Sequence, residues 1–302
     1  MSAKLLDGEA LAAKIKQGLK KEIKNLSKAG HQPHLVAVQV GENPASRVYV
    51  KQQKKACEEM GLVYELKELG AEISFEELTY TIDELNKEKK VSGIILQMPL
   101  PAHLDARTIQ TEIAPTKDVE GMHPVNMGML VYGNSRLAPP TALGAMELLQ
   151  SSGVDLKGKE VTVVGHSEIV GKPIALMLLA SQMESATPTV CHIATRDLVF
   201  HTKRADVLIV AAGKAGLIRA EMIKPGAIVI DIGINRVPVL DENGQPVLNE
   251  KGKPKKKTVG DVEFEQAEEI CSYISPVPGG VGPLTVTMLI KNTVTCTKLQ
   301  QN

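Results

Sequence analysis

The chain has 302 residues, of which 43% are hydrophobic and 23% charged, and its 35 basic residues balance 35 acidic ones. Such a chain is long enough for two domains and has the composition of a globular protein. With no net charge it has no overall field that would attract nucleic acid or an anionic membrane, so we expect neither partner and expect a small molecule instead. No apolar run approaches the roughly 20 residues that cross a bilayer, and the N-terminus lacks the apolar segment of a secretion signal, which favours the cytoplasm.

The first half of the chain alternates helical and strand patterns. We predict helices over 11–26 and 48–60 and strands over 35–40 and 93–97. This alternation is typical of an α/β domain. Two prolines then interrupt the chain before Thr141, a residue suited to cap the N-terminus of a helix that links two domains.

The second half repeats the α/β pattern, with strands predicted over 161–164, 189–192, 207–211 and 227–230. Their connections are too long for hairpins and suit right-handed parallel crossovers, which predicts a Rossmann-type sheet. Residues 239–258 carry turn signals and lysines and predict an exposed hairpin. After Pro283 the chain predicts a terminal helix.

The four cysteines, Cys57, Cys191, Cys271 and Cys296, are far apart and show no spacing typical of metal ligands. We therefore expect small, buried, reduced side chains and no metal site.

Tyr49 and Gln53 are four residues apart in the predicted helix 48–60, so they share one helix face. The other candidate neighbour, at the third position, is Gln52. Lysines 51, 54 and 55 lie roughly 140 to 240° around the helix from Tyr49. This face therefore presents a phenol and an amide but no lysine.

A glycine turn follows the strand predicted over 161–164. Gly165 and Gly171 permit close backbone approach, Ser167 can form a hydrogen bond, and a helix begins beyond them. The positive end of that helix would favour a pyrophosphate group. Taken alone, the motif is equally compatible with a strand-to-helix turn that binds nothing.

Six separated segments together resemble the bifunctional methylenetetrahydrofolate dehydrogenase/cyclohydrolase family. In the first, Ser46, Tyr49, Lys55, Ala56 and Gly61 match the family signature, whereas Gln53 stands where the family has its catalytic lysine. The others are IILQMPLP (94–101), PTKDVEGMHPVNMG (115–128), VVGHSEIVGKP (163–173), KPGAIVIDIGIN (224–235) and SPVPGGVGPLTV (275–286).

The resemblance implies two α/β domains, with a folate-binding catalytic domain over 1–145 plus 284–302 and a Rossmann-type NAD(P)-binding domain over 146–283. The C-terminal helix would return to the first domain, and the family is commonly a homodimer. The expected catalytic positions are Tyr49, Gln53, Gln97 and Glu120. Folate contacts would come from Ser46, Tyr49, Gln97, Met98, Pro99, Leu100, Glu120, Pro278, Gly279 and Gly280. Cofactor contacts would come from Thr141, Gly165, His166, Ser167, Ile169, Val170, Gly171, His192, Ala212, Gly213, Ile232, Gly233, Ile234 and Thr285.

Two departures from the family bear on activity. Gln53 replaces the lysine that moves a proton in ring opening, and Glu120 replaces a shorter aspartate beside the pterin. An amide has no acid or base state near neutrality, so we expect a dehydrogenase whose cyclohydrolase activity is weak or absent. Three alternatives stay open: a bifunctional enzyme in which Lys54 or a water substitutes, a non-catalytic folate or dinucleotide sensor, and a related pterin carrier as substrate.

The cofactor expectation rests on two further departures. Where NADP-using members of the family have arginine and serine, this chain has His166 and Ile193, and Glu168 adds a negative charge nearby. A dianionic phosphate needs donors or cations, so NAD is favoured over NADP. Arg196 is the contrary observation, together with His192 and His166, either of which could be protonated and contact a phosphate.

Overall fold

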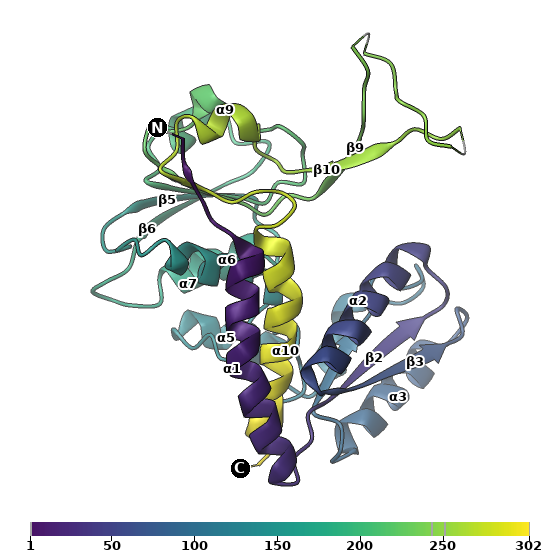
Figure 1. Cartoon of the computed structure of the whole chain (residues 1–302). Helices are drawn as coiled ribbons and strands as arrows, with labels where there is room; N and C mark the ends of the chain where they lie inside the picture. Colours follow the sequence, from purple (N-terminus) through teal and green to yellow (C-terminus); the bar gives the residue numbers. More distant parts are fainter. Residues whose placement is uncertain (1, 243, 251, 302) are drawn as a thin grey trace. The chain divides into compact units, whose positions relative to one another are not determined.

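The structure, a computed structural model, describes residues 2–242, 244–250 and 252–301, except the side chains at 44–46 and 48. The chain divides into two compact units, each with its own sheet (Figure 1). The three-stranded unit comprises residues 12–143 and the chain from Thr285 onward. The six-stranded unit comprises residues 144–284 and the N-terminal segment that ends at Leu11. The predicted class, two α/β domains, is confirmed.

The three-stranded sheet is parallel, with β2 (His34–Val40) between β3 (Val63–Leu69) and β4 (Gly93–Leu96). All seven residues of β2 are buried, because its alternating side chains enter two different cores. Leu35 and Ala37 pack against helices α1 (Gly8–Lys28), α2 (Pro44–Met60) and α10 (Val281–Leu299). Val36 and Val38 pack against α3 (Phe75–Lys87) and α4 (Ala106–Glu112).

Strand β3 and helix α3 were not predicted. Strand β3 alternates exposed and partly buried residues, so it lacks the apolar run that marks its neighbour β2. The N-terminus of α3 carries a usable signal, since Ser74 Oγ accepts from the Glu77 amide at 3.1 Å and the Glu77 carboxylate accepts from the Ser74 amide at 2.9 Å. This reciprocal pair is a capping box, and it fixes where the helix begins.

Helix α10 returns the chain to the three-stranded unit, as predicted. It lies beside α1 (Figure 1), where Leu289 and Ile290 share a core with Leu19 and Ile23. Buried Asn292 donates from Nδ2 to the carbonyls of Val119 at 2.8 Å and Ala138 at 2.9 Å. The helix thereby holds the segment that leads directly into Glu120.

The six-stranded sheet is also parallel throughout, in the order β1-β11-β8-β7-β5-β6. Its strands are β1 (Lys4–Leu5), β5 (Glu160–Val164), β6 (Thr187–Cys191), β7 (Val207–Val210), β8 (Ile228–Asp231) and β11 (Tyr273–Ile274). The four strands predicted in this region are all present. Strand order reverses at β5, where β6 lies on one side and β7 on the other, and ligands of such sheets bind at this switch point.

The expected domain boundary is wrong for the first residues of the chain. Strand β1 pairs with β11, and the backbone amides of Ala3 and Leu6 donate to Glu268 and Ile274, so this segment belongs to the six-stranded unit. A two-residue edge strand has too little pattern to be recognised. Thr141 is likewise not a cap, because α6 (Pro140–Ser151) already begins at Pro140.

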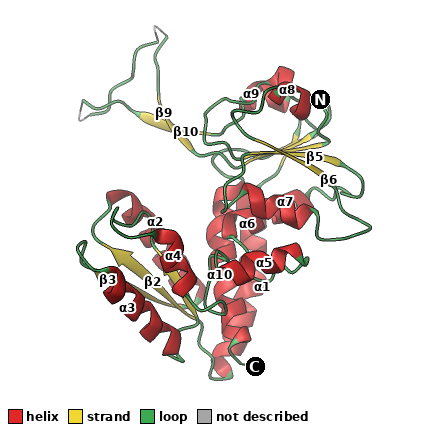
Figure 2. Cartoon of the chain, turned by 180° about the vertical axis from the view of Figure 1, so that it is seen from behind, coloured by secondary structure: helices red, strands yellow, loops and turns green. Residues whose placement is uncertain are grey.

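Strands β9 (Asn235–Pro238) and β10 (Lys256–Val259) pair antiparallel and carry a long projecting arm (Figure 2). This agrees with the predicted hairpin, although positions 243 and 251 within its turns lie outside the described residues. The four cysteines are free and buried. None of the helices described has the length and apolarity that crossing a membrane requires.

Replacing Asn292 with Ala is expected to lower the free energy of unfolding by about 2 to 4 kcal/mol, because two buried carbonyls lose their donors. Urea unfolding followed by circular dichroism measures the change. Asn25→Ala, at an exposed position of α1, is the matched control and should change stability by less than about 0.5 kcal/mol. Equal losses in the two variants would contradict this account.

Candidate functional site

Helix α2 presents Tyr49 and Gln53 on one face, as the sequence predicted, but in different environments. The side chain of Tyr49 is 57% exposed and that of Gln53 only 9%. Gln53 Oε1 accepts hydrogen bonds from Gln97 Nε2 at 2.9 Å and from the Tyr64 hydroxyl at 3.3 Å. The amide oxygen is thus held by two donors. The side chain of Ser46, one turn earlier, lies outside the described part of the structure.

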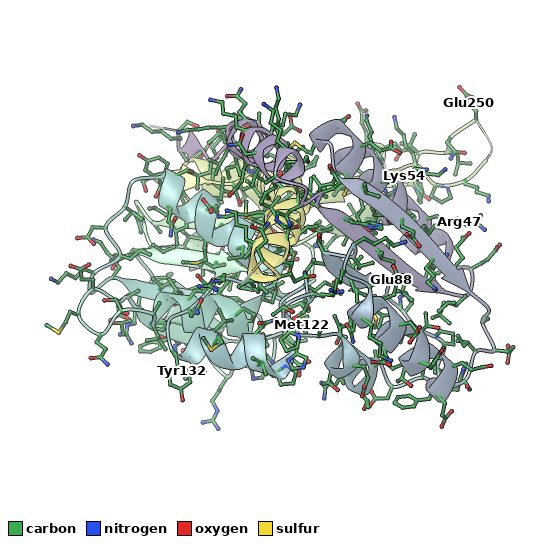
Figure 3. The ribbon with its side chains drawn as sticks, turned by 90° about the horizontal axis from the view of Figure 1, so that it is seen from below. Arg47, Lys54, Glu88, Met122, Tyr132 and Glu250 are labelled. Atoms are coloured by element: carbon green, nitrogen blue, oxygen red, sulfur yellow. The ribbon has the colours of Figure 1, made fainter. Side chains whose placement is uncertain are left out.

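The lysines of α2 lie away from this face. Lys54 extends from the helix at an exposed position (Figure 3), and its Nζ is 4.0 Å from the Glu58 carboxylate. Lys55 Nζ is 3.8 Å from the Glu59 carboxylate. Both are exposed pairs within one helix turn, which contribute little to stability. Neither lysine is placed beside Gln53.

Glu120 reaches the same region from another loop. Ile94 of β4 and Asp118 form a parallel bridge, which carries the loop alongside the strand that ends at Leu96. The Leu96 backbone hydrogen-bonds the Glu120 carboxylate, and Gln97 follows in sequence. Three of the four predicted catalytic residues, Gln53, Gln97 and Glu120, are therefore brought together in the three-stranded unit.

The Glu120 carboxyl has an altered pKa. Although its side chain is only partly buried, desolvation raises the pKa to about 8, the negative charge of Asp118 adds to the rise, and the Leu96 backbone hydrogen bond opposes it. Asp118 itself accepts from the His123 backbone at 2.8 Å and from Asn126 Nδ2 at 2.9 Å. These contacts hold together the 118–126 segment that carries Glu120.

Tyr64 is a contact residue that the sequence did not predict. It lies on β3, which pairs with β2 in parallel register, and its partly buried ring brings the hydroxyl to Gln53. Burial raises the pKa of this phenol, so it is a donor at neutral pH. Recognising β3 as the strand that follows α2 would have placed Tyr64 beside that helix.

The segment after Gln97 contains the remaining expected folate contacts of this unit. Met98 and Pro99 are exposed, whereas Leu100 packs against the core on the α3 side of the sheet. In the six-stranded unit, Pro278 is exposed and Gly279 O accepts from the Gly8 amide at 3.0 Å.

In the six-stranded unit, the glycine turn lies at the carboxyl end of β5. A Cβ on Gly165, whose φ is +118°, would lie 2.1 Å from Ala211 O, and one on Gly171 would lie 2.0 Å from Gly165 O. Only glycine permits these close approaches. Helix α7 (Gly171–Leu178) begins there without a side-chain cap. The Lys172 amide donates to Ser167 O at 3.0 Å, so the glycine loop is closed by its own backbone, and the positive end of the helix dipole points toward it.

Other predicted cofactor residues surround the same sheet edge. Ser167 and Ile169 are exposed in the glycine loop, Val170 is buried, and the rings of His166 and His192 are 5.0 Å apart. Ala212 and Gly213 follow β7, and the 232–234 segment follows β8. Thr141 and Thr285 instead belong to the three-stranded unit, where their hydroxyls are 3.4 Å apart.

A parallel sheet with a glycine turn at its switch point and an uncapped helix behind it defines a dinucleotide-binding α/β protein. Comparison with known proteins agrees. The catalytic-domain profile of the tetrahydrofolate dehydrogenase/cyclohydrolase family matches residues 6–120, and the NAD(P)-binding-domain profile of that family matches residues 139–301.

Individual relatives match over nearly their whole length. The bifunctional protein FolD of Acetivibrio thermocellus is 49% identical and covers 99% of both chains. The crystal structure of the bifunctional FolD enzyme from Campylobacter jejuni is 45% identical, covers 99% of each chain and superposes with a TM-score of 0.89. The Trypanosoma brucei enzyme, solved with NADP and an inhibitor, is 38% identical over 100% of this chain and 99% of its own, with a TM-score of 0.88.

The chain therefore belongs to the tetrahydrofolate dehydrogenase/cyclohydrolase family, as the sequence resemblance indicated, and is an enzyme with an NAD(P)-binding domain.

The raised pKa of Glu120 predicts a pH-dependent stability difference between the wild type and Glu120→Gln. The ordinary pKa of this carboxyl is 4.5, and in the folded protein it is about 8. Between these two pH values the carboxyl is protonated in the folded state and ionised in the unfolded state, so the free energy of unfolding of the wild type falls as pH rises. The variant has no such loss and should gain about 3 to 4 kcal/mol relative to the wild type from pH 5 to 8. Urea unfolding at each pH measures this, with the exposed Glu112→Gln as control. A pH-independent difference would contradict the assignment.

Proposed function

We propose that the protein oxidises methylenetetrahydrofolate to methenyltetrahydrofolate by hydride transfer to NAD(P), with cyclohydrolase activity weak or absent. The observation that carries the proposal is Gln53, a buried amide whose oxygen already accepts from Gln97 and Tyr64. The two half-reactions make different demands on the protein. Hydride transfer requires geometry, whereas ring opening requires a group that moves a proton.

The proposed folate site begins on α2. Exposed Tyr49 offers a ring for the flat part of the substrate, and Ser46 lies one turn before it in sequence. Gln97 and Glu120 would orient the pterin through hydrogen bonds, while Met98, Pro99 and Leu100 supply apolar surface. In the six-stranded unit, Pro278, Gly279 and Gly280 could contribute backbone groups.

The proposed dinucleotide site fits the glycine turn. Gly165, Ser167 and Gly171 would hold the pyrophosphate at the start of α7, since the two glycines leave the backbone without side chains there and the helix dipole favours an anion. The segments after β7 and β8, with His166, His192 and Thr285, would contact the rest of the cofactor. The nicotinamide, when bound, accepts the hydride.

The predicted loss of ring opening follows from the chemistry of Gln53. Its amide neither accepts nor releases a proton near neutrality, and general acid–base help is typically worth about 100 to 10,000-fold. The hydroxyl of Tyr64 is not a substitute acid, since burial raises its pKa. Glu120 holds a proton below about pH 8, and in our proposal it hydrogen-bonds the pterin ring and does not act on the bond that opens.

A fully bifunctional enzyme is the second candidate, favoured by the names of the relatives from Acetivibrio thermocellus and Campylobacter jejuni. Under this alternative, Lys54 or a water held by Gln53 moves the proton. The exposed pairing of Lys54 with Glu58 weighs against the lysine. Lys54→Met should leave both activities unchanged under our proposal and abolish hydrolysis if Lys54 moves the proton.

We also propose NAD as the preferred cofactor. Ile193 is 67% exposed, where an apolar side chain offers a 2′-phosphate no donor, and Glu168 places a carboxylate 3.5 Å from Lys172 Nζ, which offsets that positive charge. The relative from Trypanosoma brucei binds NADP, and exposed Arg196 and His166 could serve a phosphate here. We favour NAD because apolar Ile193 and the Glu168 carboxylate make this loop a poor site for a dianionic 2′-phosphate.

A homodimer through the six-stranded unit is the oligomeric state we propose. Strand β6 forms an edge of the sheet, and the projecting arm exposes Leu240 and Leu248 at 53% and 59%. An unpaired edge and exposed apolar side chains are typical of surfaces that pair with another chain. Sedimentation equilibrium is expected to give the mass of two chains, and a mass of one chain at micromolar concentration would refute the dimer.

The central test is a steady-state assay of both half-reactions with NAD and with NADP. We expect methylenetetrahydrofolate oxidation with kcat/KM higher for NAD, and methenyltetrahydrofolate hydrolysis at least about 100-fold slower than oxidation. Gln53→Lys should raise hydrolysis about 100-fold or more, because Gln97 and Tyr64 already surround that position. Gln52→Lys, on the adjacent exposed position, is the control. If the wild-type protein hydrolysed methenyltetrahydrofolate as fast as it oxidises methylenetetrahydrofolate, the proposal would be wrong.

A further inference from the structure

Two buried carboxylates lie close together in the six-stranded unit: Asp231 is the last residue of β8, and Asp261, whose amide donates to it, follows β10. Asp231 is 3% exposed and Asp261 0%. Neither belongs to the residues so far assigned to folate or cofactor. A buried carboxylate is stable only when its oxygens accept several hydrogen bonds or face a cation, so their partners reveal what they do.

Asp261 holds the loop that follows β7. Its Oδ2 accepts from the backbone amides of Ala212 at 2.6 Å and Gly213 at 2.8 Å. Its Oδ1 accepts from Asn235 Nδ2 at 2.8 Å, at the first residue of β9. One side chain therefore joins two separate segments at the carboxyl edge of the sheet, where the cofactor is proposed to bind.

Asp231 holds Asp261 in turn. Its Oδ1 accepts from the amides of Gly233 at 2.9 Å and Asp261 at 3.0 Å, and its Oδ2 accepts from Val262 at 2.9 Å. Burial raises the pKa of Asp231 to about 7, the charge of Asp261 adds to the rise, and the three amide donors oppose it. The two carboxylates are thus linked through the backbone of Asp261.

Two glycines are required by this arrangement. A Cβ on Gly233 would lie 2.2 Å from Asp261 Cγ, and one on Gly260 would lie 1.8 Å from Asp231 Oδ2. The backbone of each glycine is pressed against the carboxylate of the other segment, so the segments around residues 231–235 and 260–262 form a single packed unit. Such packing transmits the position of Asp261 to the loops it holds.

We infer that Asp261, supported by Asp231 and Asn235, is a positioning residue that fixes the 212–213 loop and the 232–235 segment in the geometry that binds the nicotinamide dinucleotide. The inference rests on the proposed function of this edge. Asp261 does not touch the ligand. It sets the direction of backbone groups that do, so its removal is expected to weaken nucleotide binding and leave the folate site of the three-stranded unit unaffected.

The test is direct nucleotide binding by isothermal titration with NAD and NADP, using the full chain. Asp261→Asn keeps the shape of the side chain, but its new NH2 group must face either the backbone amides or the Asn235 amide group, all of which are donors. The dissociation constant of the nucleotide is expected to rise at least about tenfold. The KM for methylenetetrahydrofolate should stay within about twofold of the parent. The control is Asp206→Asn, which disrupts the pair with Lys224 Nζ at 2.6 Å in the same unit and should leave nucleotide affinity unchanged.

Rescue separates positioning from general destabilisation. The double variant D261N/N235D exchanges the carboxylate and the amide of this pair, so one donor and one acceptor face each other again. It is expected to bind the nucleotide at least about threefold more tightly than D261N alone. If D261N does not fold, Asn235→Ala removes only one donor and should still weaken binding about threefold. Wild-type affinity for the nucleotide in these variants, or an equal loss of affinity in the Asp206 control, overturns the inference. If the wild-type protein binds neither nucleotide, the proposed function is overturned as well.

Discussion

Parallel strand pairing is the constraint that organises both units. Every pair in the three-stranded and six-stranded sheets, over the residues described, runs parallel. Parallel pairing brings the carboxyl ends of all strands to one edge and buries both faces under helices. Gln97, the glycine turn, and the segments after β7 and β8 all occupy such edges because of strand direction alone. The chemistry of each unit is then decided by which side chains occur at those few positions.

Burial sets the protonation of Glu120 at the edge of the three-stranded sheet. Desolvation raises the pKa of its carboxyl most, and the like charge of Asp118 adds to the rise. A cation nearby would instead favour the ionised carboxylate.

The sequence predicted the elements whose signal is local. The apolar runs of β2 and β5 identified buried parallel strands, and Gly165 and Gly171 identified a turn that only glycine can form. Contacts between distant segments were not accessible. Tyr64 meets Gln53 only through the register of β3, a strand hidden by its polar alternation, and Asp261 meets Asp231 across 30 residues that include a hairpin. Strand β1 is too short to carry any pattern, and its partner β11 lies at the other end of the chain.

The division between the two units falls within helices α1, α6 and α10, because Leu11, Leu143 and Leu284 each end a segment partway along a helix. A helix advances about 1.5 Å and turns about 100° per residue. A single-residue insertion or deletion in any of these three helices would therefore have to be absorbed by both units at once. Neither unit is a contiguous stretch of sequence, so neither can be exchanged between relatives as a single gene segment.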